Sequence, residues 1–155
     1  MAFMQNNPRL AEPAHPLLRR TFSLDRANRS LVLVRRIVAD VLARHDHLLE
    51  LQEQVEVLWD TPGLQRQSAC EALGAMAECI RGYLDELEDI GVELRDWTLG
   101  VVDFPAVAGG RDVYLTWRHD EPEIAAWHGA TEDHAVRRPL EALPVLDPSP
   151  AESLR

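Results

Sequence analysis

The longest pattern in the chain is a run of mainly apolar residues spaced alternately by three and four positions. It covers about five heptads, and its members are Leu24, Ala27, Leu31, Val34, Val38, Val41, His45, Leu48, Gln52, Val55 and Trp59. This spacing is typical of a helix that packs along a seam, as in a coiled coil. Ser23 precedes the run and is a suitable N-cap. The pattern therefore predicts a long helix that begins near residue 24.

A second helical pattern follows a break at Asp60-Thr61-Pro62-Gly63. Its apolar positions are again three and four residues apart, and they are Cys70, Leu73, Ala77, Ile80, Leu84 and Leu87. Gly91 is a typical C-terminal stop. Because the connection is short, the two patterns predict an antiparallel helical hairpin over residues 23–91.

Beyond the second helix the apolar residues alternate with polar ones, which is the period of a β-strand. Gly109-Gly110 stands between two such segments and favours a tight hairpin. In the second segment Val113, Leu115 and Trp117 share one face of the strand. The pattern predicts a small antiparallel sheet of three or four strands over residues 92–143, so the fold class is α+β.

A turn at 119–122 leads into a further strand-like segment at 124–128. If that segment folds back directly, Arg118 lies opposite Glu123 and Tyr114 lies opposite Trp127. Both are favourable cross-strand pairs.

The two ends of the chain carry prolines and no apolar period. We therefore expect a flexible arm at 1–20, a single α+β domain at 21–143 and a flexible tail at 144–155. A length of 155 residues suits one domain.

Composition limits the classes of partner. All 16 basic residues are arginine, and the formal net charge of −10 argues against nucleic acid or an anionic membrane as a partner. No apolar run approaches the length of about 20 residues that spans a bilayer. Cys70 and Cys79 form no disulfide framework, so we expect a reducing cytoplasm as the location.

Charge is unevenly distributed along the predicted hairpin. Residues 24–44 carry a net charge of +3, whereas residues 45–60 hold five acids and no arginine, and residues 82–90 carry −4. The hairpin tip is therefore an acidic surface. Apolar positions outside the seam are left to pack on the sheet or on a second subunit, as in a four-helix bundle, and they are Val32, Leu33, Ile37, Leu42 and Leu49.

Several motifs of the second half carry a family resemblance, together with Phe22 to Asn28 at the start of the first helix. They are Asp103-Phe104-Pro105-Ala106, Gly110-Arg111, Val113 to Arg118, Glu121, Ile124 and Trp127-His128. The chain resembles the bacterial domain of unknown function 2203 family over roughly residues 21–140. That family often has Cys where this chain has Thr116. The resemblance implies the same fold and no known activity.

Two kinds of binding site are open from the residue types. Asp103, Glu121 and His128 offer ligands that suit zinc or another divalent ion, although their spacing matches no familiar metal motif. Alternatively, His128 is a structural histidine bonded to a carboxylate.

The second kind is an anion pocket of planar guanidinium donors and aromatic walls, formed by Arg111, Tyr114, Trp117, Arg118, Trp127 and Arg137. Against it, Arg118 pairs with Glu121 or Glu123, and the aromatic residues fill the core between sheet and helices.

The sequence contains no nucleophile signature and indicates no particular cofactor, and it leaves open whether the protein is an enzyme. These patterns favour a homodimeric binding or scaffold protein, joined through the helical hairpin and without established catalysis. The alternative is a metal- or anion-dependent site on the sheet, with or without catalysis. The expected partners are a second copy of the chain and a small anion or divalent metal.

Overall fold

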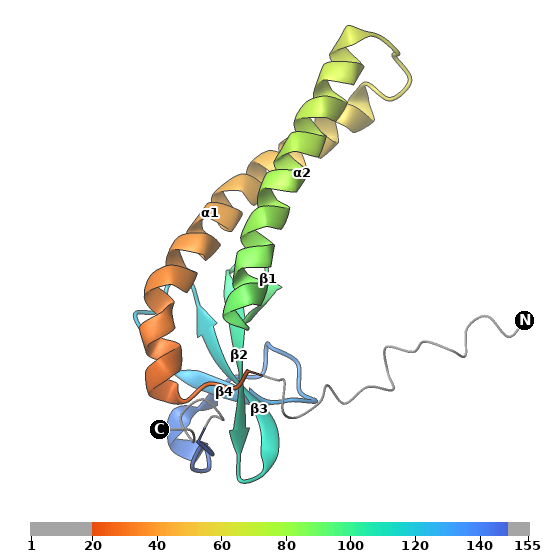
Figure 1. Ribbon diagram of the computed structural model, residues 1–155. Coiled ribbons are helices and arrows are strands. Elements are labelled where there is room, and N and C mark those ends of the chain that lie inside the picture. Colours follow the sequence, from red (N-terminus) through yellow and green to blue (C-terminus); the bar gives the residue numbers. More distant parts are fainter. Residues whose placement is uncertain (1–19, 149–155) are drawn as a thin grey trace, which may run out of the picture.

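The computed structural model describes residues 20–148, which form two long helices followed by a five-stranded antiparallel sheet (Figure 1). The helices are α1 (Leu24–Val57) and α2 (Leu64–Ile90). The strands are β1 (Glu93–Asp96), β2 (Val101–Ala108), β3 (Arg111–Arg118), β4 (Ala126–Gly129) and β5 (Arg138–Pro139), followed by a 3-10 turn at Leu140–Ala142.

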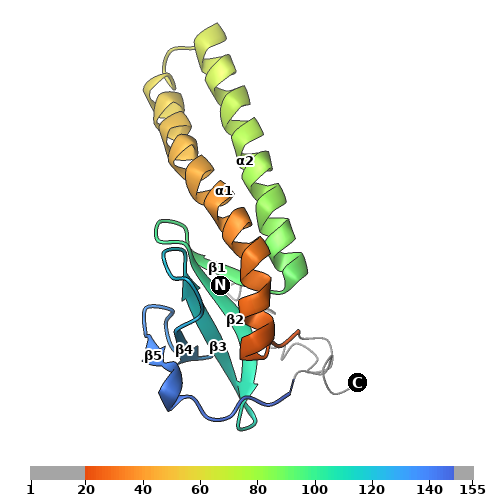
Figure 2. The same ribbon diagram turned by 90° about the vertical axis from the view of Figure 1, so that its left-hand side faces the viewer.

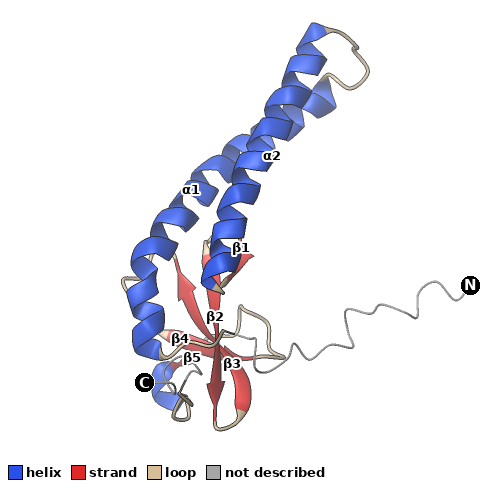
Figure 3. Ribbon diagram, in the orientation of Figure 1, coloured by secondary structure: helices blue, strands red, loops and turns tan. Residues whose placement is uncertain are grey.

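The predicted fold class and helical hairpin are confirmed, and helices and strands form separate layers (Figure 3). The strand count differs from the predicted three or four. Neighbours in the sheet follow the chain order β1-β2-β3-β4-β5. The additional strand, β5, is only two residues long, so it carries no alternation that a pattern could reveal.

Both predicted helix ends are present. The Ser23 side chain accepts a hydrogen bond of 3.2 Å from the backbone N–H of Arg26, which caps α1. Gly91 ends α2 with a φ of 96°, and its N–H donates to the carbonyls of Leu87 and Glu88.

The lower half of α1 packs against the sheet and α2, whereas its upper half projects beyond the sheet with α2 alone beside it (Figure 2). In the lower half the predicted seam is buried from Ala27 to Val41. Toward the tip the buried position moves from Gln52, which is exposed, to Leu51. A heptad seam repeats every 3.5 residues, whereas a straight α-helix has 3.6 residues per turn. Over several turns the buried face of the helix therefore moves away from the seam positions.

The predicted seam of α2 is wrong at Cys70 and Ala77, both of which are exposed. Ala69 is buried in place of Cys70, and Met76 is half-buried in place of Ala77. The contact face of α2 is therefore rotated by one residue at these two turns.

The apolar positions outside the seam divide between two environments. Ile37 is buried in the core and Leu42 is half-buried against it. Val32, Leu33 and Leu49 remain 71%, 50% and 49% exposed. Within one chain, three of the five therefore have no core to enter.

One face of the sheet forms the core with α1. Val102 and Phe104 of β2 and Leu115 and Trp117 of β3 are fully buried there, as the alternation on β3 predicts. Phe22 fastens the start of α1 to this sheet, because its N–H donates to the Pro105 carbonyl at 2.8 Å and its ring meets that of Phe104 edge-on.

The predicted pairing of β3 with the next strand is wrong by one residue. Tyr114 lies opposite His128 and Leu115 lies opposite Trp127. The connection is longer than a direct fold-back, since β4 starts only at Ala126. A shift of one residue exchanges the faces of a strand, so His128 takes the face that the prediction assigned to Trp127.

The predicted arm lies outside the described residues except for Arg20. The start of the predicted tail is held on the sheet, because Leu146 bridges to Ala108. The N–H of Asp147 also donates to Val107, and its carboxylate accepts from Gly110. Within residues 20–148, no helix has both the length and the apolar character needed to cross a bilayer.

Two glycines give a matched test of this packing. Gly100 has a φ of +70°, and a Cβ there would lie 2.8 Å from Cβ of His119 and 3.1 Å from Val38 and Leu42. We expect Gly100→Ala to lower the free energy of unfolding by about 1–2 kcal/mol from the backbone alone, with the clash in addition. Gly82→Ala, where a Cβ meets nothing within 4 Å, should raise it by about 0.5–1 kcal/mol. Urea unfolding of both variants measures this, and equal effects would contradict the packing.

Candidate functional site

A buried polar cluster occupies the face of the sheet opposite the helices. We call Arg95, Asp103, Tyr114, Thr116 and His128 the Asp103 cluster. Asp103 alternates with the core residues Val102 and Phe104 and has no exposed surface. Its Oδ2 accepts hydrogen bonds from Arg95 Nε at 3.0 Å and from His128 Nε2 at 2.8 Å. One carboxylate therefore joins β1, β2 and β4.

Both ring nitrogens of His128 are engaged. Nδ1 lies 2.9 Å from the Gly129 carbonyl, which can only accept, while Nε2 faces the Asp103 carboxylate. Since His128 is also 2% exposed, it has no nitrogen left to ligate a metal or to take a proton from a substrate. Its role in the cluster is to hold Asp103.

Two oxygens of the cluster lack partners. Oδ1 of Asp103 and Oγ1 of Thr116 are buried, and neither has a hydrogen bond within the described part of the chain. Their residues lie directly opposite each other in the pairing of β2 with β3. Buried polar atoms are rarely left unsatisfied, so these two oxygens are exceptions within a cluster whose other polar contacts are paired.

Arg95 and Tyr114 complete the cluster. The Tyr114 ring stacks on His128 with centroids 5.3 Å apart, and the Arg95 guanidinium lies 5.2 Å from the Tyr114 ring. Partial burial opposes the charge of Arg95, but the carboxylates of Glu93 and Asp103 outweigh it and raise the pKa of Arg95. Arg95 therefore remains a cation beside Asp103.

A small cavity of about 230 Å³ adjoins the cluster. Arg95, Asp103, Tyr114 and His128 line it, together with Glu132, Asp133 and His134 of the loop after β4. Pockets for drug-sized molecules have volumes of roughly 300–1,000 Å³. This cavity therefore suits an ion or a molecule of a few atoms, and it excludes a nucleotide.

Glu132 fixes the loop that closes this cavity. Its side chain accepts from the Gly129 N–H at 2.8 Å and from Arg138 Nε at 3.0 Å. The hydrogen bond from Arg138, followed by that from Gly129, lowers the pKa of Glu132 from its ordinary 4.5 to about 2. Glu132 is therefore ionised at any pH near neutral.

The structure brings together two of the three predicted metal ligands. Asp103 and His128 are in contact, whereas Glu121 forms an ion pair with Arg137 and accepts from the Arg118 N–H at 2.9 Å. Within residues 20–148, no group of three His, Cys, Asp or Glu side chains is arranged to hold a metal ion.

The arginines predicted to bind an anion are spread over the sheet. Arg118 pairs with Asp120 at 2.7 Å and Arg137 pairs with Glu121, while Arg111 lines a separate hollow together with the predicted Trp127.

The three predicted aromatic walls are also apart. Trp117 is fully buried in the core, and its Nε1 donates to the Glu121 carbonyl at 2.9 Å. Trp127 donates to the Pro139 carbonyl at 3.0 Å. Of the six predicted anion ligands, only Tyr114 lines the cavity beside Asp103.

Sequence reasoning missed Arg95, Glu132 and the position of Thr116. The available sign was Asp103 itself, a single charge inside the apolar run Val101 to Phe104. A buried charge requires partners, but which residues supply them depends on strand register.

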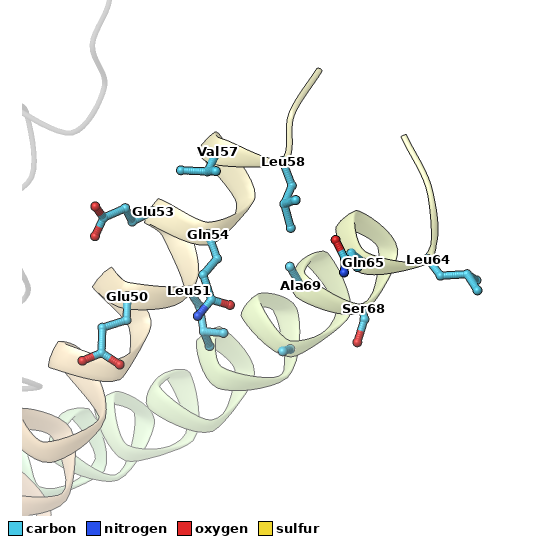
Figure 4. Close-up of a pocket in the computed structure, with 11 residues that line it drawn as sticks. Glu50, Leu51, Glu53, Gln54, Val57, Leu58, Leu64, Gln65, Ser68 and Ala69 are labelled. Atoms are coloured by element: carbon cyan, nitrogen blue, oxygen red, sulfur yellow. The ribbon is translucent and has the colours of Figure 1, made fainter. Parts of the chain in front are cut away.

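The second feature is an open apolar groove at the hairpin tip (Figure 4). It has a volume of about 870 Å³ and lies between the end of α1, with Leu51, Val57 and Leu58, and the start of α2, with Leu64 and Ala69. Glu50 and Glu53 stand beside it. The groove thus combines an apolar floor with an acidic border.

The molecule is an α+β protein with a helical hairpin on one face of an antiparallel sheet and a buried polar cluster on the other. A sequence model of the family described as "Uncharacterized conserved protein (DUF2203)" matches residues 20–140. The chain belongs to this family, as its motifs indicated. None of the curated proteins and none of the solved structures compared with it matches this chain.

The lowered pKa of Glu132 predicts how acid affects the fold. Its stabilising contribution is fully present above pH 4.5 and is lost as the pH falls toward about 2. The free energy of unfolding of the native chain should fall in that window, and Glu132→Gln should remove part of the fall. An NMR titration of the Glu132 carboxyl carbon measures its midpoint directly. Arg138→Ala should move that midpoint upward, and a native midpoint near 4.5 would contradict the geometry.

Proposed function

We propose that this protein is a homodimeric binding or scaffold module, assembled through the helical hairpin. The observation that carries the proposal is the outer face of α1, which faces neither the sheet nor α2. A stripe with helical spacing runs along it, all of it exposed: Arg29, Val32, Arg36, Ala39, Ala43, Glu50, Glu53 and Val57. We call these residues the α1 stripe.

The α1 stripe is complementary to itself in the antiparallel direction. Its lower end carries Arg29 and Arg36 and its upper end Glu50 and Glu53. When two copies pair about a two-fold axis, residue i of one meets residue j of the other and the reverse. With the axis near residues 44–45, Arg36 meets Glu53 and Val32 meets Val57 at both ends.

Apolar surface supports the same pairing. Of the eight large apolar side chains that are exposed within residues 20–148, six lie between Val32 and Leu64. They include Val32 at 71% and Val57 at 75%. Four of the six lie on α1, and Trp59 and Leu64 lie at the hairpin tip. Exposed apolar residues gathered in one region of a surface indicate an interaction surface.

The tip groove has a suitable occupant in this arrangement. Its border includes Glu50, Glu53 and Val57, which belong to the α1 stripe. In the antiparallel dimer the lower end of the partner's α1 lies there, and that end carries the exposed Val32 and Leu33. Small Ala39 and Ala43 near the axis allow the helices to approach closely. Two hairpins then form a four-helix bundle.

Charge reversal tests the proposed register. Arg36→Glu alone sets like charges against Glu53 at both ends of the dimer, and Glu53→Arg does the same against Arg36. Each variant should weaken the dimer by about tenfold or more, since each exposed pair contributes up to about 1 kcal/mol and occurs twice. An equimolar mixture of the two variants restores attraction at both ends and should dimerise like the native chain. Sedimentation equilibrium at micromolar concentrations measures all three.

Arg81→Glu is the matched control, because Arg81 is 72% exposed on α2 and lies outside the α1 stripe. It should leave the dissociation constant unchanged. A native chain that remains monomeric at every concentration would overturn the proposal. If the mixed dimer dissociates as readily as the dimers of the single variants, the antiparallel register is wrong.

A further inference from the structure

We infer that the cavity beside Asp103 binds a small organic cation with N–H donors, of the alkylammonium or guanidinium class, through Asp103 Oδ1. The cavity lies on the face of the sheet opposite the hairpin. The inference is therefore independent of the proposed dimer.

The first step is the state of the Asp103 carboxylate. Oδ2 receives two donors, at 2.8 and 3.0 Å, and Oδ1 receives none. The residue has no exposed surface and lines the cavity. Arg95 and His128 hold the carboxylate from two strands, so it is fixed before any ligand arrives. A fixed acceptor that lacks a donor is suited to a ligand that brings one.

The second step is the sign of the charge. Three carboxylates line the cavity, those of Asp103, Glu132 and Asp133, against one guanidinium, that of Arg95. Arg95 is already paired with Asp103 and Glu93. Glu132 is likewise paired with Arg138, so Asp133 is the lining carboxylate that has no arginine partner among the described residues. Asp133 has a side chain that is 70% exposed. An added anion would face the unpartnered Oδ1 of Asp103, whereas a cation with N–H groups would supply the donor that this oxygen lacks.

The third step separates an organic cation from a metal ion. A metal site in a protein takes several oxygen or nitrogen ligands. Here both nitrogens of His128 are occupied, and the residues that the structure describes include no group of three metal ligands. One carboxylate oxygen suits a hydrogen bond better than coordination. A volume of about 230 Å³ accepts a cation of a few heavy atoms.

The experiment is a titration of the full-length protein followed by two-dimensional 1H–15N NMR. Methylammonium and methylguanidinium are the probes, each taken to millimolar concentrations. Tetramethylammonium has the same charge and no N–H group. Acetate, phosphate, Mg²⁺ and Zn²⁺ test the anion and metal alternatives. We expect saturable shifts of the amides around residues 103, 116 and 128 with at least one N–H probe, and none with the other compounds.

Asp103→Asn tests the contact itself. If the amide oxygen keeps the donors Arg95 and His128, the new NH2 group presents donors to the cavity where the native chain presents an acceptor. Binding should weaken by about 10- to 100-fold, as for the loss of a hydrogen bond to a charged group. Asp120→Asn is the matched control, because Asp120 pairs with Arg118 outside the cavity; its affinity should equal that of the native chain.

Asp133→Asn keeps the test decisive if Asp103→Asn does not fold. It leaves the Asp103 cluster intact and removes one exposed charge, so binding should weaken by about two- to fivefold. The inference is overturned if neither N–H probe binds, since Oδ1 is then merely hydrated. It is also overturned if tetramethylammonium binds equally well, or if an anion or a metal ion binds in preference to both probes.

Discussion

The buried carboxylate of Asp103 is the interaction on which the arrangement of the sheet depends. An ionised group without exposed surface is tolerated only where donors replace its water. Here the donors come from β1 and β4, while Asp103 itself lies on β2. The register of three strands is therefore tied to one side chain. A slip of one residue in β4 would place Trp127 on this face and leave the carboxylate without its second donor.

The same constraint explains why both faces of so small a sheet are buried. The face toward α1 is apolar and excludes water through Phe104, Leu115 and Trp117. The opposite face excludes water by polar pairing, with the loop after β4 closed over it by Glu132 and Arg138. The second face can therefore contain a cavity with fixed charges, which an apolar core could not stabilise.

Much of the fold could be read from local patterns because local physics decides it. Ser23 and Gly91 act within a single helical turn, and the alternation of Val113, Leu115 and Trp117 follows from the geometry of one strand. The pairing of β3 with β4 could not be predicted from the sequence, because it depends on the length of an irregular connection. The rotated contact of α2 at Ala69 was equally out of reach, since small residues stand at several adjacent positions and tertiary packing selects among them.

The candidate site divides along the same line. Asp103 and His128 are recognisable as residues with chemistry, whereas their grouping requires the register. Glu121 and the arginines had the right residue types, but Glu121 is paired with Arg137, and Arg118 is paired with Asp120. The sequence therefore identifies the charged residues, but it does not distinguish a residue that binds a ligand from one that forms an ion pair within the fold. The unpartnered oxygen of Asp103 is a property of three-dimensional pairing alone.

The length of α1 determines how the proposed dimer would place the two proposed cation sites. Each sheet lies at the lower end of its own hairpin (Figure 1), and the antiparallel pairing of the α1 stripe sets the two lower ends at opposite ends of the bundle. A helix of 34 residues is roughly 50 Å long, so the two cavities of a dimer would face different neighbourhoods and fill independently. Such a dimer would hold one cavity at each end of the bundle, because the self-complementary charges of α1 favour antiparallel pairing. A partner that presents two cationic groups far enough apart to reach both cavities would gain avidity that one cavity cannot provide.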